Sequence, residues 1–90
     1  MEVKVTKPDA KEIEKLGAKS WPIWEKEESE FEWEYGEKET CLILEGRAQV
    51  KNEEGKIVAE FGAGDLVVFP EGLKCVWKIT KKIRKHYKFG

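Results

Sequence analysis

Few side chains in this sequence have the chemistry of a catalytic or metal-binding site. The two cysteines, Cys41 and Cys75, could form a thiol pair, ligate a metal or act as nucleophiles. Buried cysteines more commonly pack as small apolar residues, and both alternatives stay open. The one histidine, His86, is predicted to face solvent, which leaves a cysteine nucleophile without a base. The residues alone therefore predict no complete catalytic arrangement.

The elements that must position these residues are predicted to be short β-strands. From Ser29 onward apolar residues recur at every second position, and glycines separate the segments at turn-like spacing. A hairpin loop is expected at residues 52–56, where Gly55 can take a positive φ. This density of strands and turns favours an antiparallel sandwich or barrel. The strands are expected at residues 29–35, 40–44, 47–51, 57–61, 66–69, 73–80 and 83–89.

The segment before residue 29 is predicted to differ from the rest. A short strand at residues 3–6 is followed by a helix at residues 10–16, with a proline before it and a glycine after it. The aromatic segment from Trp21 to Trp24 contains a proline, which argues against a central strand. Both tryptophans are therefore expected to cover the outside of the barrel or to contact a partner.

The charged residues are numerous but balanced. The 90 residues include 17 basic and 18 acidic ones, and the two signs alternate, so neither a nucleic-acid nor a membrane partner is predicted. Charged residues, mostly Lys and Glu, make up 39% of the chain, which is typical of proteins from heat-loving organisms; engineering could give the same composition. Without an apolar leader or span, and with only two cysteines, a cytoplasmic protein with reduced thiols is expected rather than a Cys41–Cys75 disulfide.

Two stretches of the chain resemble the two conserved motifs of the cupin barrel. The first motif ends in a glutamate and a glycine with six residues between them, as Glu39 and Gly46 do here. The second contains a glycine, five residues and then Pro-x-Gly, as in Gly64, Pro70 and Gly72. The resemblance covers nearly the whole chain. It is to the small single-domain cupins of unknown function, similar to the ureidoglycine aminohydrolase and ethanolamine-utilisation cupins.

The resemblance implies an all-β fold, the cupin jelly-roll barrel or double-stranded β-helix, with one short N-terminal helix. The chain is then a single cupin domain of residues 1–90. Residues 1–28 supply the N-terminal strand, helix and aromatic segment, and residues 29–90 supply the barrel.

The resemblance also implies a metal site, because related cupins hold a divalent ion with imidazoles and a carboxylate. Here Trp33 and Tyr35 replace the two histidines of the first motif, and Cys75 replaces the histidine of the second. Glu39 and Cys75 remain as candidate ligands for Zn, Mn, Ni or Fe, too few for tight binding unless another donor such as Cys41 joins them.

Alternation along the strands predicts which side chains share the barrel interior. If the matched Glu39 points inward, so does Cys41, and an inward Cys75 implies an inward Trp77. On the last strand Lys85 shares the apolar side. Because a buried ammonium or carboxylate is costly without a partner, we predict that Lys85 and Glu39 pair inside the barrel, the ammonium taking the electrostatic role of the metal. In the alternative, Lys85 extends to the rim and Glu39 is solvated at the mouth.

Three aromatic side chains are predicted to face the same interior, namely Trp33, Tyr35 and Trp77. They either form the barrel core or provide a stacking wall for a small ring or sugar. Asp65, in a Gly-Asp turn, is expected to bond nearby backbone donors.

Three functional hypotheses follow. The first is a cupin that binds a small polar molecule. The second is a metal-dependent enzyme of the aminohydrolase kind, with Glu39 and Cys75 as ligands and Lys85 as an acid–base group. The third is a structural or partner-binding module. A homodimer is expected, because cupins often pair and the strand at residues 3–6 is predicted to be free. The candidate ligand-binding residues are Trp33, Tyr35, Glu39, Cys41, Cys75, Trp77 and Lys85.

Overall fold

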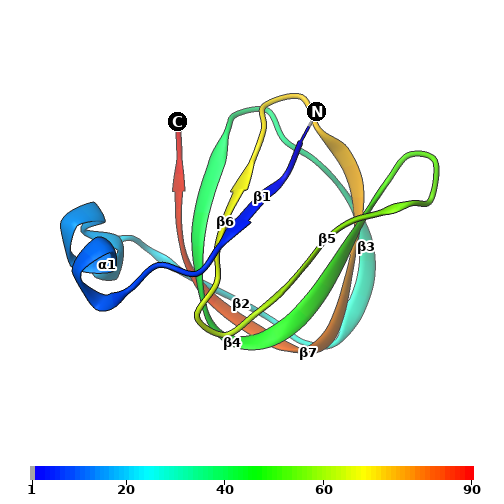
Figure 1. The fold of residues 1–90 in the computed structure, drawn as a ribbon. Coiled ribbons are helices and arrows are strands. Elements are labelled where there is room, and N and C mark those ends of the chain that lie inside the picture. The colour runs from blue at the N-terminus through cyan, green and yellow to red at the C-terminus, as the bar shows by residue number, and fades with distance from the viewer. Residues whose placement is uncertain (1) are drawn as a thin grey trace.

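Strands dominate the computed structural model, which describes residues 2–90 (Figure 1). The predicted helix is present at its predicted bounds, and a single turn of 3-10 helix follows it. In chain order the elements are β1 (Lys4–Thr6), α1 (Ala10–Leu16), η1 (Ala18–Ser20), β2 (Ile23–Lys26), β3 (Ser29–Glu34), β4 (Glu39–Asn52), β5 (Ile57–Gly62), β6 (Leu66–Phe69) and β7 (Lys74–Phe89).

Two long, bent strands, β4 and β7, organise the barrel. Residues 39–45 of β4 pair with residues 84–89 of β7, and residues 47–52 pair with residues 75–81. Around the first pair the strand order is β1-β6-β4-β7-β2, whereas β5 and β3 flank the second pair. The sheet therefore folds over into two halves that face each other across the interior (Figure 1).

The predicted number of strands is wrong at both long strands. The expected strands at 40–44 and 47–51 are parts of β4, and those at 73–80 and 83–89 are parts of β7. Register shifts between Ile43 and Ala48 let the pairing continue through the bend. The period-two pattern breaks at such a shift although the strand does not, which explains the error.

Gly46 is a position at which the two bent strands approach each other closely. Its φ is 97°, and a Cβ built there would lie 2.0 Å from the carbonyl oxygen of Lys82. Only glycine accommodates both that backbone conformation and that approach. The close approach of the Lys82 backbone and the positive φ thus explain why a glycine occupies this position of the first cupin motif.

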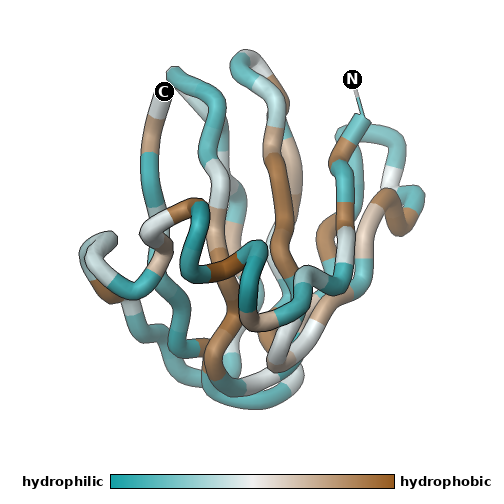
Figure 2. The backbone as a smooth tube through the Cα atoms, turned by 60° about the vertical axis from the view of Figure 1, so that its left-hand side comes forward, coloured by the Kyte–Doolittle hydropathy of each residue, from teal (hydrophilic) through white to brown (hydrophobic). Residues whose placement is uncertain are grey.

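Aromatic rings fill the interior below the open end of the barrel. The rings of Tyr35 and Phe69 stack with centroids 4.8 Å apart, and Phe61 meets Trp77 edge-on at 5.2 Å. The indole N–H of Trp77 donates to the hydroxyl of Tyr35 at 3.1 Å, so the two buried polar groups satisfy each other. Hydrophobic stretches run along the strands and alternate with hydrophilic positions (Figure 2).

The N-terminal residues take part in the barrel. β1 pairs with β6 and β2 pairs with β7, so the sheet draws on more of the chain than the expected range of 29–90. The prediction that the N-terminal strand is free is therefore wrong. Asp65 accepts hydrogen bonds from the Gly62 amide and from Lys7 Nζ, both at 2.9 Å, and so holds its turn as expected.

His86 is buried rather than exposed to solvent. Alternation along β7 directs it away from the interior side that Lys85 occupies. The residue is only 8% exposed, because its ring lies against the segment between η1 and β2 rather than in solvent. Nδ1 lies 2.8 Å from the Trp21 carbonyl oxygen and donates to it. The only histidine is therefore kept away from the interior.

Neither helix within residues 2–90 has the length and apolar character needed to cross a membrane. Both cysteines are free thiols.

Candidate functional site

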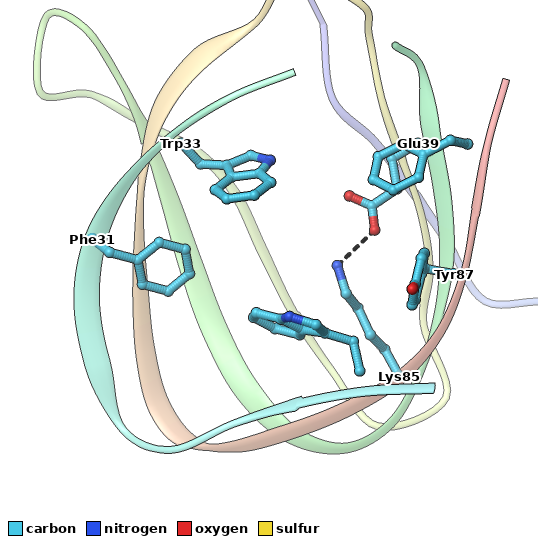
Figure 3. A pocket seen from close by; sticks show the side chains of 7 residues that line it. Phe31, Trp33, Glu39, Lys85 and Tyr87 are labelled. Carbon is cyan, nitrogen blue, oxygen red and sulfur yellow. Dashed lines mark hydrogen bonds and ion pairs between the residues drawn. The ribbon is translucent and has the colours of Figure 1, made fainter. Parts of the chain in front are cut away.

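A pocket of about 150 Å³ lies at the open end of the barrel (Figure 3). Its side chains come from four strands, because the facing halves of the folded sheet each contribute one wall. Five aromatic rings surround one carboxylate and one ammonium group. The lining residues are Trp24, Phe31, Trp33, Glu39, Lys85, Tyr87 and Phe89.

The charged groups of the pocket form a buried ion pair. Lys85 Nζ donates to Glu39 Oε2 at 2.7 Å, and the two side chains are only 6% and 4% exposed. Glu39 begins β4 and pairs with Phe89, whereas Lys85 on the neighbouring β7 pairs with Ile43. The contact therefore depends on the long Lys85 side chain, which extends along the interior to reach Glu39. The predicted pair is confirmed, and the alternative of a solvated Glu39 with Lys85 at the rim is wrong.

Two indole rings flank the ammonium group of Lys85. Nζ lies 4.9 Å from the ring centroid of Trp24 and 4.9 Å from that of Trp77, within the range of cation–π attraction. Trp24 reaches this place because it pairs with Lys85 in the β2–β7 ladder. The expectation that Trp24 covers the outside of the barrel is therefore wrong. Pro22 precedes the first residue of β2, and β2 lies at the sheet edge, where a proline in that position is tolerated.

The second carboxylate oxygen of Glu39 is available to a ligand. Among residues 2–90 no donor is bonded to Oε1, whereas Oε2 accepts from Lys85. The free oxygen points toward the cavity, on the side where Trp33 lies (Figure 3). The pocket therefore presents an unused acceptor beside a cation.

The predicted site residues divide between the pocket and the core beneath it. Trp33, Glu39 and Lys85 line the pocket, and Trp33 is 47% exposed at its mouth, so the interpretation that places Trp33 in the barrel core is wrong. Tyr35 and Trp77 are each 2% exposed and do belong to the core.

Both thiols lie away from the pocket lining. Cys41 is completely buried, while the Cys75 thiol donates to the Trp33 carbonyl oxygen at 3.6 Å. Cys75 instead borders a shallow depression of about 520 Å³ that is lined mainly by charged and polar side chains. The structure therefore separates Cys75 from the lining that contains Glu39.

Four lining residues are absent from the predicted set, namely Trp24, Phe31, Tyr87 and Phe89. Tyr87 and Phe89 share the strand parity of Lys85, and Phe31 shares that of Trp33, so alternation could have added these three. Trp24 had no comparable signal, because its place depends on the pairing of β2 with β7.

Burial holds both thiols in their protonated form. It raises the pKa of Cys41 from 9.0 to about 12; the nearby Glu39 carboxylate also raises it, and Lys85 lowers it. Burial, and secondarily Glu39, raises the pKa of Cys75 to about 11. Burial raises the pKa of Tyr35 even further above its usual value. Metal ligation and nucleophilic attack require the thiolate, which these environments disfavour.

The donor set does not fit a divalent metal. Glu39 is engaged by Lys85, both thiols are held protonated, and His86 lies outside the barrel. No cluster of three or more His, Cys, Asp and Glu side chains suited to a metal ion occurs in the described part of the chain.

Comparison with known families supports the architecture. The model of the EutQ-like cupin domain matches residues 13–87. The chain belongs to the EutQ-like cupins. The jelly-roll barrel inferred from the two motifs is thereby confirmed.

Solved structures of other cupins resemble this one to different extents. A DUF861 family protein from Thermotoga maritima is 49% identical, with a TM-score of 0.95 over 99% of this chain and 100% of that one. Its source fits the composition typical of heat-loving organisms. A DUF861 protein of unknown function from Pseudomonas syringae is 26% identical over 76% of this chain and 29% of its own, with a TM-score of 0.66.

The EutQ protein of Clostridium difficile shows the fold alone. It is 21% identical with a TM-score of 0.67, and the match covers 74% of this cupin and 52% of that protein. No protein of curated function matches the sequence. These relatives therefore supply no specific function for the family.

Proposed function

We propose that this cupin binds a small polar molecule in the pocket above the Glu39–Lys85 ion pair. The observation that carries the proposal is the combination of a buried, hydrogen-bonded pair with an open cavity beside it. Binding sites typically join apolar walls to a few well-placed polar groups, and this pocket has that composition.

The size of the pocket limits the ligand. An engineered protein cavity of about 150 Å³ holds one benzene molecule. The pocket has about the same volume, so a ligand of roughly one six-membered ring fits inside, and a larger one would extend past Trp33 and Phe89. These two side chains are 47% and 44% exposed, so they flank the entrance.

The other two functions have less support. A metal-dependent aminohydrolase needs a ligand set that Glu39 and the protonated Cys75 do not provide. A purely structural barrel would be filled with side chains, whereas this one has space beside Glu39.

Nuclear magnetic resonance with benzene-sized probes tests binding directly. Benzene, phenol and 2-pyridone are titrated while the indole N–H signals of the four tryptophans are followed. We expect saturable shifts of the Trp24 and Trp33 signals, and little change at Trp21, which is not part of the lining. Trp24→Ala should weaken binding about tenfold by removing a wall, and Trp21→Ala is the matched control. Absence of saturable shifts for every probe would refute the proposal.

We also propose that the protein is a cytoplasmic homodimer. The absence of a bond between the buried Cys41 and Cys75 supports the compartment. The location of β1 at a sheet edge supports pairing, because its outer side leaves backbone groups unpaired. Sedimentation velocity tests the dimer, and a mass of one 10.4 kDa chain at every concentration would contradict it.

A further inference from the structure

We infer that the pocket recognises a neutral, planar ligand by an edge that carries an N–H donor next to a carbonyl acceptor, as in a lactam ring. The inference rests on the proposed binding function and specifies its chemistry. The ligand N–H would donate to Glu39 Oε1, and the ligand carbonyl would accept from Lys85 Nζ. Both groups line the same cavity.

The donor on the ligand is required by the free oxygen of Glu39. Oε1 has no bonded donor among residues 2–90 and is not fully buried, so water can reach it before a ligand binds. A ligand that fills about 150 Å³ displaces this water. If the ligand brings no donor, a carboxylate oxygen is left buried and unsatisfied, and that loss opposes binding.

The acceptor on the ligand is required by the ammonium group of Lys85. Of its three N–H groups, one is directed to Glu39, and the indoles of Trp24 and Trp77 flank Nζ at 4.9 Å. Aromatic faces attract the charge, but they are weaker partners than an oxygen acceptor. A carbonyl oxygen entering beside the ion pair would complete the hydrogen bonding of the ammonium group.

Neutrality of the ligand follows from the charge balance of the pocket. Glu39 and Lys85 cancel, and the five other lining residues are aromatic and uncharged. A ligand carboxylate would face Glu39, and a ligand ammonium would face Lys85, at short range and away from bulk water. Each would bring like charges together, whereas a neutral donor–acceptor edge satisfies both groups.

Planarity follows from the walls. The rings of Phe31, Trp33 and Tyr87 surround the space beside the ion pair (Figure 3). Trp24 and Phe89 complete the lining of this cavity of about 150 Å³. A flat ring can stack on or meet these rings edge-on over most of its surface. A branched or puckered molecule of the same volume would make fewer such contacts.

Three matched probes test the inference. They are 2-pyridone, which has the edge; N-methyl-2-pyridone, which lacks the donor; and benzene, which lacks both groups. In the wild-type protein we expect 2-pyridone to bind at least about tenfold more tightly than either of the other two. In the double variant Glu39→Leu/Lys85→Met, which replaces the pair by apolar groups, the preference should disappear while benzene still binds.

The outcomes separate the two proposals. If all three probes bind the wild-type protein within threefold, the pocket binds but does not select this edge, and only the inference is overturned. The same holds if the preference persists in the double variant. If no probe binds, the proposed function fails and the inference with it. If the double variant does not fold, the nuclear magnetic resonance signal of the Glu39 carboxyl carbon in the wild-type protein tests the inference instead. 2-Pyridone should shift this signal and benzene should not, and equal shifts would overturn the inference.

Discussion

At the scale of single residues, Lys85 places a positive charge beside Glu39 but cannot supply the chemistry of a metal. A bound metal would offer open coordination positions, whereas the ammonium offers only hydrogen-bond donors. Its charge is balanced by Glu39 and flanked by Trp24 and Trp77, so the group is held in place. This arrangement favours recognition of a ligand over activation of a substrate.

Removing one member of the ion pair should be far more damaging than removing both. Lys85→Met leaves a carboxylate buried without its partner, and Glu39→Leu leaves an ammonium in the same condition. Each single variant should lower the free energy of unfolding by about 3–5 kcal/mol. The double variant Glu39→Leu/Lys85→Met should lie within about 1 kcal/mol of the wild type or above it. Urea unfolding at neutral pH gives the free energy of unfolding of the wild type, the two single variants and the double variant. If the loss in the double variant equalled the sum of the losses in the two single variants, this account would be contradicted.

At the scale of elements, the bends in β4 and β7 make the pocket possible. Glu39 and Lys85 lie on the halves of these strands that pair with each other beside β6 and β2. Phe31 and Trp33 belong to β3, which pairs with the other half of β7. The bends therefore bring the polar groups of one half of the sheet opposite the aromatic groups of the other.

Gly46→Ala should disrupt this bend. The added Cβ would lie 2.0 Å from the Lys82 carbonyl oxygen, so both strands would have to separate. Gly55→Ala is the matched control, because Gly55 also has a positive φ, 82°, but nothing within 4 Å of the added carbon. We expect a loss of about 1–2 kcal/mol from backbone strain in the control and at least about twice that in Gly46→Ala. Equal urea midpoints for the two variants would show that the close approach has no cost.

Alternation predicted the interior well where a strand is regular. It placed Glu39, Cys41 and Lys85 on the inside, and from that came the ion pair. It failed where position depends on a distant partner. Trp24 enters the pocket only because β2 pairs with β7, and His86 is buried only because the N-terminal segment covers it. Neither pairing leaves a periodic signal in the sequence.

At the scale of the whole molecule, the barrel is divided into a closed aromatic core and an open pocket. The core holds three protonated groups, the thiols of Cys41 and Cys75 and the hydroxyl of Tyr35, whose pKa values burial raises. The charged residues lie mainly outside, and the exposed face of β3 carries Glu30, Glu32 and Glu34. Ionisation inside the core is therefore costly for the entire fold.

Stability should consequently fall in alkaline solution in a way that depends on Cys41. Above pH 9 the unfolded chain releases the thiol proton, while the folded protein keeps it up to a pKa of about 12. The unfolded state then binds fewer protons, so the free energy of unfolding decreases as the pH rises through this window. Cys41 contributes at most about 1.4 kcal/mol per pH unit to the decrease. Urea unfolding between pH 8 and 10.5 should give a shallower decline for Cys41→Ala than for the wild type, even though the variant is less stable at pH 8. Parallel curves would mean that the Cys41 thiol ionises as readily in the folded barrel as in the unfolded chain.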